Sequence, residues 1–160
     1  MAKATVQSIH IAPAAKSAMQ TVGQVMAFPG AGLEGDRYAL KLGSFYKPLP
    51  DYELTLIESE AIDALKRDYK IEIAPGHARR NIVTSDVALN HLVGRDFWVG
   101  EVRIHGIRLC EPCSHLEGLT GQPVIKGLIH RGGLRAQILS LGMIRVGDPI
   151  EMDNGHSHPS

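Results

Sequence analysis

The sequence is poor in cysteine and aromatic residues, and it contains no long apolar run. Its two cysteines are too few for a disulfide-stapled secreted domain, so we expect reduced thiols. No segment of about 18 apolar residues is present to span a bilayer, and residues 1–20 lack the apolar core of a signal peptide. The 17 basic residues balance the 17 acidic ones, which argues against a surface for nucleic acid or anionic membranes. These features predict a cytoplasmic protein.

The 160 residues are enough for one domain, and 44% of them are apolar, which supplies a core. The last residues are polar and have nothing to bury. We therefore expect a single domain over residues 1–152, followed by a flexible polar tail over residues 153–160.

Short apolar segments with alternating polar residues predict a β-rich fold. Gly100 and Gly106 interrupt the longest of them and indicate a turn or a bulge. The last two segments flank Ser140-Leu141-Gly142 and predict a hairpin. We expect six to eight short, mostly antiparallel strands from the segments 5–11, 22–26, 53–57, 97–109, 134–139 and 143–146.

Helices are expected to be few. Ser59 is placed to cap a helix over Glu60–Tyr69, and two shorter helices are predicted over residues 86–92 and 123–129. Because helices and strands do not alternate, a doubly wound sheet is not expected. The prediction is a mainly β, α+β-like fold: a β-barrel with a few short peripheral helices.

Cys110 and Cys113 form a Cys-x-x-Cys pair directly after the longest predicted strand. The pair has several readings: a redox pair, half of a zinc site, buried thiols, or one exposed thiolate for a soft metal centre such as molybdenum. No βαβ pattern and no second cysteine pair support the first two. Cys110 continues the strand alternation and is expected to be buried, whereas Cys113 lies in a proline-containing turn. His115 nearby is a possible partner of Cys113 or a plain surface residue.

Further basic and hydroxyl-bearing segments occur along the chain. Arg79-Arg80-Asn81 precedes an apolar run, and its two arginines either form a fork for oxyanions or are ordinary surface charges. Neither the Pro13–Ser17 loop nor Gly32–Tyr38 has the glycine and lysine spacing of a Walker A loop, so each taken alone is a turn. The cations of His130–Arg135 complement the end of a predicted helix.

Taken together and in order, these segments resemble the MOSC domain family, the C-terminal domain of molybdenum-cofactor sulfurases. The likeness extends over about Val6 to Met152 and implies a MOSC-type β-barrel of the small stand-alone bacterial type. The resemblance lies in Gly-Leu-Glu-Gly-Asp-Arg at 32–37, Leu-Thr-Leu-Ile-Glu-Ser-Glu-Ala at 54–61, Arg-Arg-Asn-Ile-Val at 79–83, Cys-Glu-Pro-Cys at 110–113, Arg-Gly-Gly-Leu-Arg-Ala at 131–136 and Gly-Met-Ile-Arg-Val-Gly-Asp-Pro at 142–149.

The resemblance implies binding of the molybdenum cofactor, with Cys113 as metal ligand and catalytic residue. It reaches the molybdenum-dependent amidoxime reductases, whose Pro-x-Lys-Ser loop is similar to Pro13–Ser17, with one extra residue here. Their Arg-Pro-Asn segment is similar to residues 79–81, where Arg80 replaces the proline. The cofactor-binding residues implied in this way are Lys16, Ser17, Arg37, Ser59, Arg79, Arg80 and Asn81.

Three functions are compatible with the resemblance. The first is an oxidoreductase that reduces N-hydroxylated small molecules with electrons from a separate reductase. The second is a sulfur carrier, in which Cys113 receives persulfide sulfur from a pyridoxal-phosphate-dependent cysteine desulfurase for metal-sulfur cluster or cofactor assembly. A cofactor-binding protein without turnover is a third reading. No pyridoxal phosphate site of its own is expected.

Overall fold

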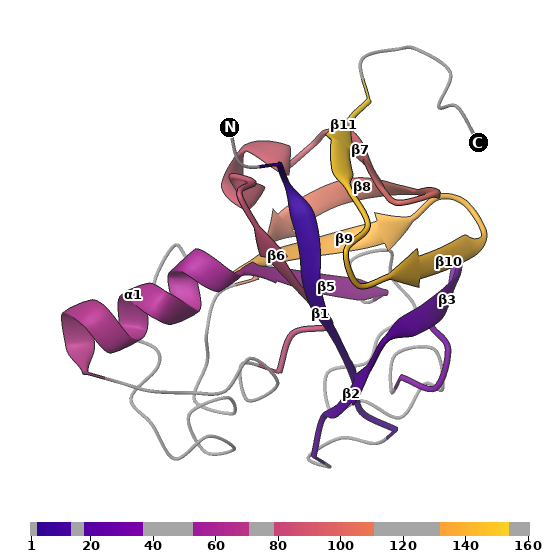
Figure 1. Ribbon diagram of the computed structural model, residues 1–160. Coiled ribbons are helices and arrows are strands. Elements are labelled where there is room, and N and C mark those ends of the chain that lie inside the picture. The colour runs from indigo at the N-terminus through magenta and orange to yellow at the C-terminus, as the bar shows by residue number, and fades with distance from the viewer. Residues whose placement is uncertain (1–2, 14–17, 37–52, 71–78, 111–131, 154–160) are drawn as a thin grey trace.

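The computed structural model describes residues 3–13, 18–36, 53–70, 79–110 and 132–153 (Figure 1). These residues form eleven strands, one α-helix and one short 3-10 helix, which confirms the mainly β prediction. The strand number exceeds the predicted six to eight because several strands have only two or three residues. Among the described residues, no helix has the length and hydrophobicity needed to cross a membrane.

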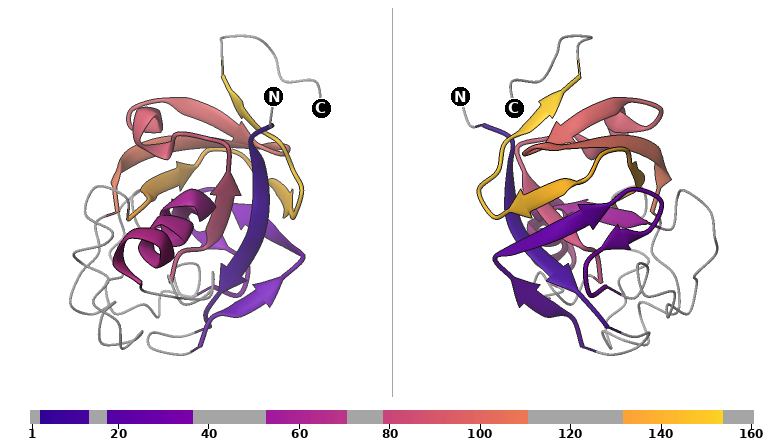
Figure 2. Two further views of the ribbon diagram at one scale, coloured as in Figure 1. Left: turned by 60° about the vertical axis from the view of Figure 1, so that its left-hand side comes forward. Right: turned by 90° about the vertical axis from the view of Figure 1, so that its right-hand side faces the viewer.

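Eight strands form one sheet that curls around the core (Figure 2). All neighbours in it are antiparallel except β5 and β6, which are parallel and are joined through the helix α1. In sheet order the strands are β11 (Ile150–Met152), β7 (Asp96–Val99), β8 (Val102–Leu109), β9 (Leu134–Ile138), β5 (Leu54–Glu58), β6 (Ile82–Ser85), β1 (Thr5–Ile11) and β2 (Gln20–Val22).

The second sheet has three strands, in the order β10 (Gly142–Arg145), β3 (Gln24–Phe28) and β4 (Gly32–Leu33). The segment predicted as one strand over 22–26 is divided at Gly23, so that β2 joins the large sheet and β3 the small one. At the outer edge of β10, Glu101 and Asp148 accept hydrogen bonds from the amides of Met143 and Arg145, both at 2.8 Å. These carboxylates satisfy amides that would otherwise be open to another strand.

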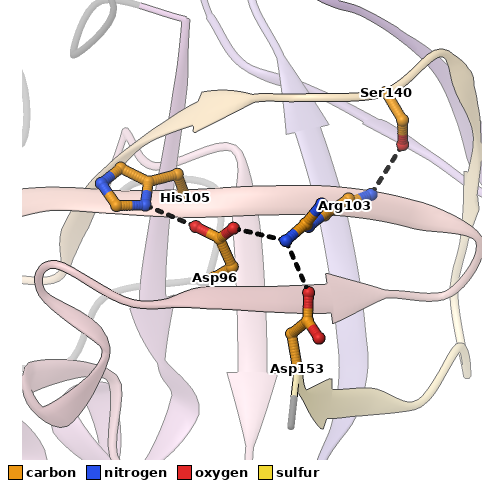
Figure 3. Close-up of polar contacts among 5 residues, drawn as sticks. All are labelled: Asp96, Arg103, His105, Ser140 and Asp153. Atoms are coloured by element: carbon orange, nitrogen blue, oxygen red, sulfur yellow. Dashed lines mark hydrogen bonds and ion pairs between the residues drawn. The ribbon is translucent and has the colours of Figure 1, made fainter. Parts of the chain in front are cut away.

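The hairpin predicted around Ser140-Leu141-Gly142 is wrong. After β9 the chain stays bonded to β8, because the Leu139 amide donates to the Arg103 carbonyl at 2.8 Å. The Ser140 hydroxyl then accepts from the Arg103 amide at 2.8 Å (Figure 3). These contacts carry the chain past β9, and β10 pairs with β3 instead.

The segment 97–109 folds as the sequence predicts. It is the β7–β8 hairpin, which turns at Gly100 with a φ of 59° and has a register shift between Gly106 and Arg108. A Cβ on Gly100 would overlap the carboxylate of Asp148, and one on Gly106 would overlap the carbonyl oxygen of Leu92. Gly106 is therefore required by a close approach of the backbone, whereas Gly100 is favoured by its left-handed φ, since the Asp148 carboxylate is the end of a side chain.

A polar cluster covers the outer side of this hairpin (Figure 3). The Arg103 guanidinium pairs with Asp96 and with Asp153, each at 2.8 Å, and His105 Nδ1 lies 2.6 Å from Asp96. Asp153, predicted as the first residue of the tail, is thereby attached to β8, while the tail residues 154–160 lie outside the described residues.

The helix α1 (Ser59–Tyr69) occupies the predicted residues, but its capping differs. Glu58 is the N-cap, without a side-chain capping bond, and Ser59 is the first helical residue. Ala61, Ile62 and Leu65 are buried, as the helical periodicity predicts.

The helix expected over residues 86–92 is shortened to the 3-10 helix η3 (Leu89–Leu92). Asp86 has a left-handed φ of 61°, which is incompatible with a right-handed helical turn, and its amide donates to Glu60 at 2.9 Å, while the Leu89 amide donates to Glu58 at 3.3 Å. The helix predicted over residues 123–129 lies outside the described residues.

Glu53 is a buried carboxylate between the two sheets. It accepts hydrogen bonds from the amide of Gly30, before β4, at 3.2 Å and from that of Ile138, at the end of β9, at 3.0 Å. Burial raises the pKa of Glu53 above its ordinary value, and the two backbone donors partly offset this effect. The folded protein therefore binds this proton more tightly than the unfolded chain does. The stability contributed by Glu53 is full at acid pH and is lost as the pH rises through the raised pKa.

Glu53→Gln keeps an acceptor oxygen and removes the buried charge. We expect the free energy of unfolding of the variant, relative to the unsubstituted protein, to increase as the pH rises from about 4 to about 7. Urea unfolding across this range measures the difference. The exposed Glu34→Gln is the matched control and should show no such trend. A difference between Glu53→Gln and the unsubstituted protein that does not change with pH would refute this account.

Candidate functional site

The structure describes half of the predicted site residues. Arg79, Arg80 and Asn81 lie immediately before β6, and Ser59 begins α1. Lys16, Ser17, Arg37 and Cys113, together with His115, lie outside the described residues. For these residues the structure describes only the neighbouring parts of the chain, which end at Pro13, Asp36 and Cys110.

Asn81 is fully buried and joins three strands. Its side-chain oxygen accepts from the amide and the hydroxyl of Thr55 on β5, both at 3.1 Å. Its side-chain nitrogen donates to the His10 carbonyl at the end of β1, also at 3.1 Å. The main chain repeats the link, since the His10 amide donates to the Asn81 carbonyl at 2.7 Å. Asn81 therefore fixes where β1, β5 and β6 meet.

Arg80 is also buried, and its guanidinium is directed at the protein backbone. Its Nε donates to the carbonyl of Gly132 at 2.8 Å, and one of its terminal nitrogens donates to the carbonyl of Cys110 at 3.2 Å. The Cys110 amide in turn donates to the Gly133 carbonyl at 2.7 Å. Arg80 thus joins the end of β8 to the start of β9, the two places between which residues 111–131 run.

Arg79 differs from its neighbour in both backbone and exposure. It has a left-handed φ of 61°, which a non-glycine residue rarely adopts, and its side chain is half-buried. The buried contacts of Arg80 and Asn81 hold the chain in this conformation. Ser59 lies four residues beyond Thr55, and its hydroxyl donates to Glu60 at 3.4 Å.

A further bond brings in the residues beside Arg37 and Lys16. The buried Asp36 carboxylate accepts from the amide of Ala12 at 2.9 Å. Ala12 follows β1 and comes shortly before the Pro13–Ser17 loop, and Asp36 directly precedes Arg37. We call the whole network the loop junction: Ala12 with Asp36, His10 with Asn81, and Arg80 with Cys110 and Gly132.

His10 is a member of this network that the sequence reasoning missed. His10 is buried, and its ring forms hydrogen bonds with two hydroxyls, that of Ser8 at 2.7 Å and that of Thr21 at 3.1 Å. Burial lowers the pKa of His10, so the neutral ring is favoured. A histidine two residues from a serine in an alternating strand was the available signal, but the contact with Thr21 depends on the β1–β2 register.

Cys110 is buried as a free thiol, as predicted for a residue that continues the strand. Within the ranges that the structure describes, no group of three or more histidine, cysteine or acidic residues is arranged to hold a metal ion. The loop junction itself offers hydrogen bonds and positive charge at the bases of several chain segments. It can position other residues and bind an oxyanion through Arg79.

Arg80→Met keeps much of the side chain and removes both donors. Because the carbonyls of Cys110 and Gly132 lose these partners in a buried place, we expect a loss of about 2–4 kcal/mol in the free energy of unfolding. Arg80→Lys should recover only part of it, since an ammonium group does not provide the fork. Urea unfolding measures both variants beside the exposed Arg145→Met. Equal stability of Arg80→Met and Arg145→Met would disprove the role of Arg80.

Substitution of Gly133 tests how closely the start of β9 approaches β5. Its φ is 109°, and a Cβ there would overlap the carbonyl oxygen of Leu56. Gly147 has a similar φ of 92° but open space around the same position. Gly147→Ala therefore reports the backbone cost alone, and we expect Gly133→Ala to lose about 1–3 kcal/mol more. Thermal or urea unfolding compares them, and equal losses would show that the overlap is relieved at no cost.

Comparisons with known proteins agree with the sequence resemblance. The model of the MOSC domain matches residues 46–151. The fold is similar to the YUAD protein from Bacillus subtilis, with a TM-score of 0.76 over 94% of this chain and 95% of that chain, at 16% identity. A comparison with curated proteins gives no match.

Two further solved structures share the fold. YiiM from Geobacillus stearothermophilus has a TM-score of 0.70 at 15% identity and covers 93% of this chain and 74% of that chain. YiiM from Escherichia coli has a TM-score of 0.69 at 19% identity, over 100% of this chain and 72% of that one. At these identities the structures show a common fold, and the family model covers most of the chain. The protein therefore belongs to the MOSC domain family.

Proposed function

We propose that this MOSC protein binds a molybdenum cofactor above the loop junction, with Cys113 as the metal ligand, and reduces N-hydroxylated compounds. One observation carries the proposal: the buried hydrogen bonds gather the bases of every segment on which the proposed cofactor-binding cations and thiol lie. A cofactor that combines a soft metal with a phosphorylated pterin needs such a convergence, because the thiolate and the cations come from different loops.

Chain connectivity supports this assignment. Cys113 is three residues from Cys110, so a trans chain keeps the two Cα atoms within about 11 Å. Arg37 follows Asp36 directly, and Lys16 is four residues from Ala12. Connectivity therefore limits how far each of the three residues can lie from the loop junction, and a thiol with guanidinium and ammonium groups is a donor set that fits the proposed group.

The two adjacent arginines, Arg79 and Arg80, have different roles in this proposal. In the proposal, Arg80 and Asn81 are positioning residues, since their side chains hold the bases of the loops. Arg79, half-buried beside them, is a cation for the phosphate or pterin oxygens, together with Lys16, Ser17 and Arg37. Ser59 stays a prediction of the sequence resemblance.

When bound, a molybdenum centre would supply the two-electron chemistry that the reduction of an N-hydroxyl group needs. The residues of this chain hold the cofactor, neutralise its phosphate and keep the thiolate in place. Electrons come from a separate reductase in this proposal.

Cys113→Ser tests the assigned ligand. After expression in a host that makes the cofactor, we expect about one molybdenum per chain in the unsubstituted protein and little in Cys113→Ser, because serine lacks the soft thiolate. Elemental analysis and pterin fluorescence measure the two parts of the cofactor. Cys110→Ala is the matched control, since Cys110 is buried, and it should retain the metal.

Two outcomes would contradict the proposal. If Cys113→Ser retained molybdenum, Cys113 would not be the metal ligand. No molybdenum or pterin in any of the proteins would remove cofactor binding, and a gain of one sulfur atom on Cys113 after incubation with a cysteine desulfurase and cysteine would then assign a sulfur carrier. If the cofactor is bound, reduction of amidoximes and hydroxylamino bases with a reductase tests the reaction.

A further inference from the structure

A cavity of about 540 Å³ lies at the opposite end of β1 and β6 from the loop junction. Its wall includes Ala4, directly before β1, and Asp86, directly after β6, whereas the junction lies at Ala12 and Asn81. Five residue steps separate Asn81 from Asp86, which is about 17 Å along an extended chain. Figure 1 shows the start of β1 and β11 together at the upper end of the molecule. The cavity is therefore separate from the proposed cofactor site.

The wall of this cavity combines an apolar floor with charged groups at its rim. Leu92 and Ile150 are buried and form part of the floor with the half-buried Val87. The exposed side chains of Asp86, His91 and Arg95 also line it. The volume lies within the range of about 300–1,000 Å³ that is typical of pockets for small organic ligands. An apolar lining with a few polar or charged groups is also typical of such pockets.

The two basic side chains are available to a ligand. Within the described part of the chain, neither His91 nor Arg95 forms a side-chain hydrogen bond or an ion pair. The arginines Arg80 and Arg103, by contrast, are engaged by carbonyls and carboxylates. A guanidinium without a partner at the rim of an apolar hollow is suited to bind a carboxylate through two parallel hydrogen bonds.

The wall is held by the main chain, so the cavity is already formed without a ligand. The Ile150 amide donates to the Ala4 carbonyl at 3.0 Å, and the Arg95 amide donates to the Leu92 carbonyl at 3.0 Å. Asp86 has a left-handed φ of 61° and is held there by the bond from its amide to Glu60. A preformed wall reduces the entropy that binding must offset.

We propose that this cavity binds a small organic monocarboxylate with an apolar body. The apolar body packs on Leu92 and Ile150, and the carboxylate pairs with Arg95, with His91 as an additional donor. Asp86 on the same wall repels a second negative charge, so a dicarboxylate or a phosphate ester is disfavoured. This binding is independent of the molybdenum cofactor.

The test uses 4-phenylbutyrate and its uncharged counterpart 4-phenylbutyramide, added to the isotopically labelled full chain. We expect 4-phenylbutyrate to shift the backbone amide signals of Ala88, Leu92 and Ile150 in a saturable manner. The amide should bind at least about tenfold more weakly, since it lacks the charge-assisted hydrogen bonds. Arg95→Gln should weaken the binding of 4-phenylbutyrate by a similar factor and leave the affinity for 4-phenylbutyramide unchanged.

Two further variants make the result decisive. Arg145→Gln removes an exposed arginine elsewhere and should leave the affinity for 4-phenylbutyrate as it is. Ala88→Trp places a large ring at the exposed Ala88 of the cavity wall and should abolish binding of both compounds. The proposal is overturned if no signals shift at millimolar 4-phenylbutyrate, if the shifts centre on Arg79–Asn81, or if Arg95→Gln binds as tightly as the unsubstituted protein.

Discussion

The buried side chain of Asn81 is the interaction on which the rest of the structure depends. β5 and β6 are parallel neighbours, and Asn81 directly precedes β6, where its amide and carbonyl bond to the Thr55 carbonyl and the His10 amide. Asn81 satisfies the Thr55 amide and hydroxyl on one side and the His10 carbonyl on the other. A fully bonded polar group in this place specifies one arrangement of three strands.

The neighbouring residue extends this arrangement to the end of β8 and the start of β9. Once Asn81 is placed, the Arg80 side chain reaches the carbonyls of Cys110 and Gly132, which lie on two other strand ends. The bond between Asp36 and Ala12 adds the segments beside β1 and β4. The sheet thus holds together residues that are far apart in the sequence: Ala12, Asp36, Asn81, Cys110 and Gly132. Loops positioned by a rigid scaffold are where binding and catalytic residues usually occur.

Much of the fold followed from local patterns. Alternation located β1, β5, β7 and β8, and the glycines at 100 and 106 marked a real turn and a real register shift. The transfer of β10 to the second sheet was not predictable, because it depends on contacts of Leu139 and Ser140 with Arg103, which local alternation does not encode. The expected second helix is likewise shortened at Asp86, whose left-handed backbone accompanies a bond from its amide to Glu60, 26 positions away.

The candidate site was predictable as a set of residue types but not as a division of roles. The sequence resemblance singled out Arg79, Arg80 and Asn81 together, and only the structure separates the buried Arg80 and Asn81 from the half-buried Arg79. The sequence did not single out His10, whose ring contact with Thr21 depends on the pairing of β1 with β2. Asp36 is part of the segment 32–37 that carries the resemblance, but its bond to the Ala12 amide joins two different sheets and could not be read from local patterns.

The most direct test of this account asks whether Cys113 lies above the loop junction. A nitroxide spin label on Cys113, in a Cys110→Ala background, broadens the amide signals of nearby residues in the labelled protein. The account predicts strong broadening at Ala12, Asp36 and Arg79 and little at Ala88 and Leu92. Strong broadening at Ala88 and Leu92, with sharp signals at Ala12 and Asp36, would contradict it.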